Sequence, residues 1–386
     1  MSAMSHGRWQ VNACLARHAA MVREQPNYQA VRIGRYTCQV IDMVGFFRPK
    51  LQGCKTKHYN GGVGKAIPAI EFGMIAEVGV IENKRTSVLT QVVRMPAKEV
   101  KHVKLRQALI VAATKAAGPT TLVLADAEFS AAELLAENAG CSFVIRAAKN
   151  CTFERAATHQ FKSSGNYKRG DIVRPLERTH NKKVKPATPA DQCEIVTHPD
   201  GTSVTVKLWF NARLPRSMIK RVAGADTDLA KCLHEAPVTV AAIHHPAFHG
   251  PLVVVTNARD LTAQELTPAY PQRWPIEVVP LAAKQLFGGA RQFVHNPEHC
   301  QRLPELYLLT GNMMTCAAAF NPASSTGFWD PKPQPTAGRL RPQISRLAAT
   351  PSFAATLKNW EKAPSRTPLT RPKQLQRHRI PAQLKC

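Results

Sequence analysis

Four residues in the C-terminal half combine a carboxylate, two cations and a phenol at regular spacing. Tyr270, Arg273, Glu277 and Lys284 are separated by 3, 4 and 7 residues. At about 3.6 residues per turn, these steps predict that all four side chains share one stripe of a helix. Such a face can hold a metal ion at its centre and phosphate groups on either side. Spacing alone favours the simpler alternative, an Arg–Glu ion pair on a solvated helix.

Two aspartates in apolar surroundings are candidates for further carboxylate ligands. Asp42 is the only aspartate before Asp126, and it lies within the apolar run YTCQVIDMV. Asp126 directly follows the run TTLVLA. A carboxylate in or at the end of a buried strand is costly unless it is paired or binds a metal. Each aspartate alone is more typical of an ion pair or a cap, but together with Glu277 they indicate a shared cation site.

The elements that must position these acids follow the order of an α/β domain. The near-continuous apolar run 120–125 predicts a strand that is covered on both faces. Ser130, followed by Glu133, predicts the cap of the next helix. The other strands are expected over residues 36–44, 65–80, 87–93, 141–146, 202–210, 238–243 and 251–256. Helices are expected over residues 11–24, 99–117, 131–138, 275–287 and 304–319. The fold class is therefore predicted as α/β, a mixed sheet flanked by helices.

The domain organisation follows from shifts in composition along the chain. The 151 residues from Asp126 to Glu277 are too many for one crossover, so a β-rich insertion between these acids is expected. Pro275 suits a first helical turn, whereas Pro280 is expected to kink the helix or delay its start. The predicted segments are a short N-terminal helical segment (1–35), a first core part (36–150), a β-rich insertion (151–255), a second core part (256–330) and a basic C-terminal arm (331–386).

Charge points to a polyanionic partner. The 52 lysine and arginine residues outnumber 26 acidic residues, which gives a formal net charge of +26, and 44% hydrophobic content suffices for a core. Nucleic acid is the first candidate and an anionic membrane surface the second. Residues 331–386 hold twelve lysines and arginines and one acid, Glu361, which suits an extended arm on a phosphate backbone. A merely solvated tail is the alternative.

Other residue types indicate the compartment. No uncharged apolar run approaches eighteen residues and no secretory signal precedes Asp42, so a cytoplasmic protein is expected. The ten cysteines contain no CxxC pair, which makes a zinc finger improbable and favours reduced thiols. His244, His245 and His249 lack an obvious carboxylate partner. They are interpreted as loop or strand-end histidines and not as a metal site.

The four-residue pattern Y-x2-R-x3-E-x6-K resembles the signature of bacterial insertion-sequence DDE transposases. It is complete at Tyr270, Arg273, Glu277 and Lys284. Neighbouring segments are also similar to that family. They are VIDMVGFFRPK and KHYNGGVGKAIPAI around Asp42, LVLADAEFSAAELL and FVIRAAKN around Asp126, and TNARDLTAQEL, KQLFGGARQF and RLPELYLLTGNMM around the signature. The resemblance spans about residues 36–345.

The resemblance implies an RNase H-like core with a catalytic triad of Asp42, Asp126 and Glu277. These acids would bind two Mg²⁺ ions, for which Mn²⁺ can substitute. Hard cations prefer oxygen ligands, and two ions about 3.5–4 Å apart serve both the attacking and the leaving oxygen of a phosphoryl transfer. The implied reaction is hydrolysis at a transposon end, followed by attack of the resulting 3′-OH on target DNA.

The resemblance also implies contacts with double-stranded DNA, both transposon ends and target. Tyr270, Arg273 and Lys284 would contact phosphates, while Trp274 would stack on a base or, as the favoured interpretation, pack in the core. A homodimer on paired ends, associated with the bacterial nucleoid, is expected, and the DNA-binding region before residue 36 is expected to be short or truncated. The alternatives are a catalytically silent transposase-derived DNA-binding protein and an RNase H-like nuclease without strand transfer, against which the full signature weighs.

Overall fold

The central strands alternate apolar side chains between two separate cores. In β3 (Tyr36–Phe47), Val40 and Val44 join one core cluster, while Ile41 joins the other. This alternation follows from the two-residue period of a strand. Strand β7 (Thr121–Ala125) behaves in the same way and is buried over nearly its whole length. The expectation that this strand is covered on both faces is therefore confirmed.

A mixed sheet results from how these strands pair. The computed structural model describes residues 9–51, 54, 56–95, 101–137, 140–156, 170–180, 183–292, 294–323, 325 and 327–348. Within them, one twelve-stranded sheet has the order β1-β5-β3-β7-β8-β16-β15-β14-β13, with β2 paired to β3 and with β4 and β6 paired to β5. Strand β3 is antiparallel to β5 and parallel to β7, which is in turn parallel to β8.

The remaining strands of this sheet are β1 (Tyr28–Ala30), β2 (Arg32–Ile33), β4 (Lys57–Asn60), β5 (Lys65–Ile81), β6 (Lys84–Val93), β8 (Ser142–Arg146), β13 (Gln192–Thr197), β14 (Ser203–Ala212), β15 (Val238–His244) and β16 (Leu252–Thr256). Two small hairpins lie outside it, β9 (Phe153–Glu154) with β10 (Ile172–Val173), and β11 (Arg178–His180) with β12 (Lys183–Lys185).

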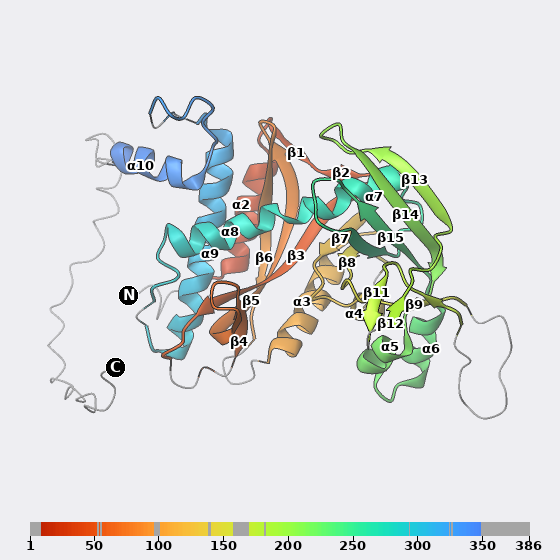
Figure 1. Cartoon of the computed structure of the whole chain (residues 1–386). Helices are drawn as coiled ribbons and strands as arrows, with labels where there is room; N and C mark the ends of the chain where they lie inside the picture. Colours follow the sequence, from red (N-terminus) through yellow and green to blue (C-terminus); the bar gives the residue numbers. More distant parts are fainter. Residues whose placement is uncertain are drawn as a thin grey trace. The chain divides into compact units, whose positions relative to one another are not determined.

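Helices cover both faces of the sheet (Figure 1). One core cluster includes residues of α2 (Val11–Arg23), α7 (Ala263–Ala269), α8 (Pro275–Gln285) and α9 (Pro297–Phe320). The other cluster includes residues of α3 (His102–Ala116), α4 (Ala131–Ala136), α5 (Arg216–Ala223) and α6 (Thr227–Glu235). The predicted fold class, α/β with a mixed sheet flanked by helices, is confirmed.

The segment expected to be a β-rich insertion continues the same sheet. Strand β16 pairs with β8, and β15, β14 and β13 follow in antiparallel order. Residues up to Leu340 form one compact unit, and a second unit begins at Arg341, within α10 (Ala337–Ala348). The domain boundaries set from composition stay a prediction, and most of the expected basic arm lies outside the described residues.

Two asparagines bind the free edge of β6, which pairs with β5 alone. Asn12, from α2, both donates to and accepts from the backbone of Val92, at 3.1 and 2.9 Å. Asn312, from α9, accepts from the N–H of Leu89 at 3.0 Å and donates to the carbonyl of Ser87 at 2.8 Å. The two amides replace a neighbouring strand and so close an edge that would otherwise be open to pairing.

Two sequence-based expectations can be compared directly with the structure. The nine cysteines within the described residues are all free thiols. None of the helices described here combines the length and apolar character that crossing a membrane requires.

Candidate active site

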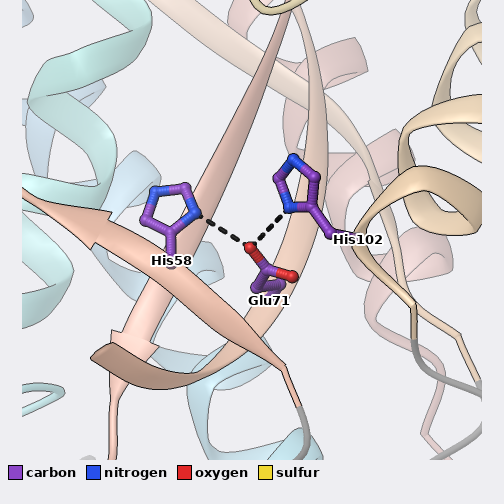
Figure 2. A group of neighbouring side chains, drawn as sticks. All are labelled: His58, Glu71 and His102. Atoms are coloured by element: carbon purple, nitrogen blue, oxygen red, sulfur yellow. Dashed lines mark hydrogen bonds and ion pairs between the residues drawn. The ribbon is translucent and has the colours of Figure 1, made fainter. Parts of the chain in front are cut away.

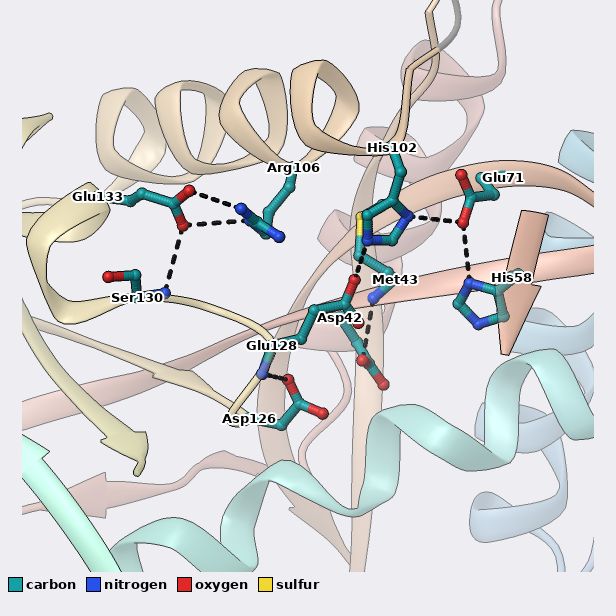
Figure 3. A network of polar contacts seen from close by, with 10 residues as sticks. All are labelled: Asp42, Met43, His58, Glu71, His102, Arg106, Asp126, Glu128, Ser130 and Glu133. Atoms are coloured by element: carbon teal, nitrogen blue, oxygen red, sulfur yellow. Dashed lines mark hydrogen bonds and ion pairs between the residues drawn. The ribbon is translucent and has the colours of Figure 1, made fainter. Parts of the chain in front are cut away.

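The parallel pairing of β3 and β7 brings Asp42 and Asp126 to the same level. Val40 is paired with Leu124, and each aspartate lies two residues further along its chain. Because side chains two residues apart point to the same face of a strand, both aspartates lie on the face where Val40 and Leu124 pack in the same core cluster as residues of α8. Since adjacent strands are about 4.8 Å apart, the two carboxylates are neighbours, as Figure 3 shows.

The turn after β7 holds Asp126 in place. The carboxylate of Asp126 accepts a hydrogen bond from the backbone N–H of Glu128 at 2.9 Å. Helix α4 then begins with the predicted cap, in which Ser130 and Glu133 form a reciprocal capping box. Glu133 also accepts from Arg106 of α3 at 2.7 Å. A local cap and a contact with the neighbouring helix therefore fix the backbone that presents Asp126.

Glu277 reaches this position from the first turn of α8. Arg273 donates to Asp42 at 3.2 Å and also bonds the carboxylate of Glu277. The arginine is buried, and 15% of the Asp42 side chain but 55% of the Glu277 side chain is exposed. One guanidinium thus joins acids that are 235 residues apart in the chain and leaves Glu277 accessible from solvent.

Negative charge accumulates at this site. Burial raises the pKa of Asp42 to about 7, with smaller contributions from the charges of Asp126 and Glu277 and opposition from Arg273. Burial alone would lower the pKa of Arg273, but Asp42, Tyr270 and Glu277 together raise it, so the guanidinium stays charged. The site thus combines three carboxylates with two cations, Arg273 and Lys284, so it can accept further positive charge.

The predicted stripe on a single α-helix is wrong in its first half. Tyr270–Arg273 is a 3₁₀ turn, and α8 begins at Pro275. The amide of Glu277 bonds the carbonyl of Trp274 at 3.0 Å. Pro275 has no N–H to donate, which suits a helical start. Pro280 lies inside α8, so the expected delay of the helix does not occur.

The other signature residues surround the acids at different depths. Tyr270 is buried, and its ring centroid lies 5.7 Å from the guanidinium carbon of Arg273. The ammonium of Lys284 lies 5.5 Å from the ring centroid of Phe46 and 5.3 Å from that of Phe47, and burial lowers the pKa of Lys284.

Trp274 occupies a different environment from the one expected. The favoured core packing is wrong, because 44% of Trp274 is exposed. Its side chain lines an open pocket of about 510 Å³ together with Val278 and the turn from Glu82 to Arg85. The indole is exposed beside this pocket. The alternative interpretation, in which Trp274 stacks on a base, therefore stays the prediction.

Sequence reasoning missed two groups of potential metal ligands. Within the described parts of the chain, two sets of three such residues have their ligand atoms within 4.8 Å of one another. They are His58, Glu71 and His102, and His198, Asp200 and His245. The three catalytic candidates are not such a set, since the Arg273 guanidinium lies between Asp42 and Glu277. The missed ligands of each group come from segments that are far apart in the chain, which no spacing in the sequence indicates.

His245 does have a carboxylate partner, contrary to the expectation for the HHxxxH cluster. Asp200 lies 3.5 Å from the Nε2 of His245 and 2.9 Å from the Nδ1 of His198. Asp200 comes from the turn between β13 and β14, about 45 residues before the histidine pair. It is about half exposed, which makes this a surface cluster.

Residues 72–309 match the family model of the transposase DDE domain. This match covers more than half of the chain. The chain belongs to the transposase DDE domain family. No curated protein matches it in a sequence search. The matched region contains Asp126 and Glu277, whereas Asp42 precedes it and is associated with them through strand pairing. The antiparallel β6-β5-β3 strands followed by parallel β7 and β8 form the RNase H-like core of this transposase-family protein.

Proposed function

We propose that this transposase-family protein is a Mg²⁺-dependent enzyme that hydrolyses a phosphodiester bond at transposon ends and then transfers the 3′-OH into target DNA. Its catalytic residues are Asp42, Asp126 and Glu277. The observation that supports this most directly is the link from Asp42 through Arg273 to Glu277, beside the paired strand β7, which Asp126 directly follows.

The donor set fits hard divalent cations. Three carboxylates supply only oxygen ligands, as Mg²⁺ and Mn²⁺ prefer. Burial, with a smaller effect of the neighbouring carboxylates, raises the pKa of Asp42 and so disfavours its charged form, which a bound cation would stabilise. When bound, two Mg²⁺ ions activate the attacking oxygen and stabilise the leaving one. Asp42, Asp126 and Glu277 would hold these ions.

The surrounding residues serve to receive DNA. Arg273 neutralises Asp42 and Glu277 in the free protein, and its planar guanidinium also suits bidentate binding of a phosphate. Tyr270 supports Arg273 from the buried side. Lys284 adds a second cation, and the exposed Trp274 offers a surface on which a base can stack. The net charge of +26 favours approach to DNA.

The proposed partners are transposon ends and target DNA, bound by a homodimer assembled on paired ends in the cytoplasm, at the nucleoid. Light scattering with and without end-bearing DNA tests the assembly. A change from one chain to two on binding two ends is the expected result.

DNA cleavage tests the enzymatic proposal. Wild type with Mg²⁺ is expected to nick DNA that carries the element ends, and Glu277→Gln to reduce the rate to background because a metal ligand is lost. Glu235→Gln, an exposed change on α6, is the matched control and should cleave normally. If wild type and Glu277→Gln both bind DNA and neither nicks it, the second candidate stands, a catalytically silent DNA-binding protein derived from a transposase.

A further inference from the structure

Two imidazoles converge on one buried carboxylate on the sheet face opposite Asp42. Figure 2 shows the rings of His58, from β4, and His102, from α3, directed at Glu71 of β5. The Nδ1 of His58 lies 3.0 Å from Glu71 Oε1, and the Nδ1 of His102 lies 2.8 Å from the same oxygen. Residues that are distant in sequence therefore place two nitrogens and a carboxylate around one point.

Glu71 is buried without enough partners to satisfy it. None of its side chain is exposed. Its second oxygen, Oε2, is buried and has no hydrogen-bond partner among the described residues. Leaving a buried carboxylate oxygen unpaired is unfavourable. A cation between the two imidazoles and Oε1 would offset the charge of this buried, incompletely paired carboxylate.

The backbone leaves room for the ring of His58. Gly45 of β3 is paired with Glu71. A Cβ at position 45 would lie 2.5 Å from the Cβ of His58 and 2.6 Å from its Cγ. Any larger residue at this position would push the imidazole away from Glu71. The absence of a side chain at Gly45 therefore leaves the space that the His58 ring occupies.

A second carboxylate orients His102. Glu128 Oε1 lies 2.5 Å from the Nε2 of His102, on the far side of the ring from Glu71. A carboxylate that holds one ring nitrogen leaves the other to bind a metal, an arrangement common around protein metal sites. Figure 3 shows that Glu128 belongs to the same turn as Asp126. The cluster is thereby connected to the candidate active site.

We propose that His58, Glu71 and His102 bind a single transition-metal cation of the zinc class, separate from the Mg²⁺ site proposed above. Two imidazole nitrogens and one carboxylate suit Zn²⁺ or Co²⁺ better than Mg²⁺, and they leave a fourth position for water. The bound ion joins β4, β5 and α3, and through Glu128 it steadies the turn that presents Asp126. The site does not depend on whether the protein cuts DNA.

A hydrogen-bonded network without metal is the alternative. Hydrogen bonds to Glu128 and Glu71 raise the pKa of His102 to about 10, so a protonated imidazole can itself supply the positive charge. The two interpretations differ in one measurable respect, since only the metal site retains a stoichiometric cation through gel filtration.

Metal analysis of the full-length, tag-free protein distinguishes them. After incubation with Zn²⁺ and gel filtration, we expect one tightly held ion per chain, and Co²⁺ in its place should give visible d–d absorption with histidine ligands. His58→Gln and Gly45→Ala are expected to lower the affinity by more than about 100-fold. The double variant His198→Gln/His245→Gln and the single variant Glu277→Gln should retain the ion, which excludes the surface cluster and the Mg²⁺ site.

A milder variant keeps the test decisive if a ligand substitution prevents folding. Glu128→Gln alters only the outer partner of His102, so we expect roughly 10- to 100-fold weaker Zn²⁺ binding at unchanged stoichiometry and an unchanged circular dichroism spectrum. The proposal is overturned if wild type retains no ion, if His58→Gln folds and binds as wild type does, or if the ion is lost only from the His198/His245 double variant.

Discussion

At the scale of single residues, Arg273 has two partners that compete with its expected ligand. Its guanidinium bonds Asp42 and Glu277, the two acids that lie on different elements. The same donors are those expected to meet a phosphate of bound DNA. The free protein thus uses Arg273 to offset the repulsion between its own carboxylates. Under the proposed function, DNA binding would exchange these carboxylates for a phosphate.

Replacement of Arg273 by glutamine should therefore affect both stability and cleavage. The change leaves the buried Asp42 without its cation, and we expect a loss of about 2–4 kcal/mol in the free energy of unfolding, measured with urea. DNA nicking should also fall to background. Lys231→Gln, on the exposed surface of α6, should change the free energy by less than about 0.5 kcal/mol. An Arg273→Gln protein as stable as wild type would contradict the assigned role.

At the scale of elements, α2 and α9 complete the sheet by side-chain hydrogen bonds as well as by packing. Their residues Asn12 and Asn312 supply donors and acceptors to the edge of β6. Asn312 is fully buried, so water cannot take its place. The unpaired backbone groups of β6 thus form hydrogen bonds with side chains of α2 and α9.

The substitution Asn312→Leu should be strongly destabilising. It leaves the N–H of Leu89 and the carbonyl of Ser87 buried without their present partner, at an expected cost of about 2–4 kcal/mol. Urea unfolding measures this loss. Asn321→Leu, at the exposed end of the same helix, should cost less than about 1 kcal/mol. Equal effects at the two positions would show that the edge hydrogen bonds add little.

His18 on α2 gives the fold a pH dependence. Burial lowers the pKa of His18, although a hydrogen bond with Asn312 opposes the shift. The folded protein therefore binds this proton less readily than the unfolded chain, and stability is lost as the pH falls below about 6.5. His18→Gln should reduce this dependence by up to about 1 kcal/mol per pH unit, as measured by urea unfolding between pH 5.5 and 7.5. His249→Gln, in an exposed loop, should leave it unchanged.

At the scale of the whole molecule, the excess of 26 positive charges should dominate the interaction with DNA. Each phosphate that a lysine or arginine neutralises releases counterions. The affinity is therefore expected to fall linearly in a plot of log K against log salt concentration. A flat plot would be incompatible with the proposed binding along the DNA backbone.

The basic arm can be tested by changing its charge without shortening the chain. Replacing Arg371, Arg377 and Arg379 by glutamine should make the salt slope shallower by up to about 3, because each phosphate contact contributes about 0.9. These positions lie outside the described residues. An unchanged slope would favour the solvated tail, and the circular dichroism spectrum should remain that of wild type in either case.

Local patterns in the sequence determined much of the framework. The apolar run before Asp126 predicted β7, and Ser130 with Glu133 close behind it predicted the cap of α4, which the structure shows to be a reciprocal capping box. These features depend on neighbours within a few residues, so they can be recognised without the fold. Asp42 and Asp126 were selected by their apolar surroundings in so basic a chain, whereas Glu277 was selected by its spacing from Tyr270, Arg273 and Lys284. The family resemblance then implied that the three acids act together.

The sequence by itself therefore determined the fold class and about half of the strands and helices, and it supplied the three candidate acids, whose catalytic role stays a prediction. Only the tertiary structure decided that Asp42 stands level with Asp126, that Arg273 joins Asp42 to Glu277, and that β13 to β16 extend the sheet. It alone brought together His58, Glu71 and His102. The reason is physical: strand pairing and packing bring together residues that are far apart in the chain. A local sequence pattern does not indicate which distant residue each one will contact.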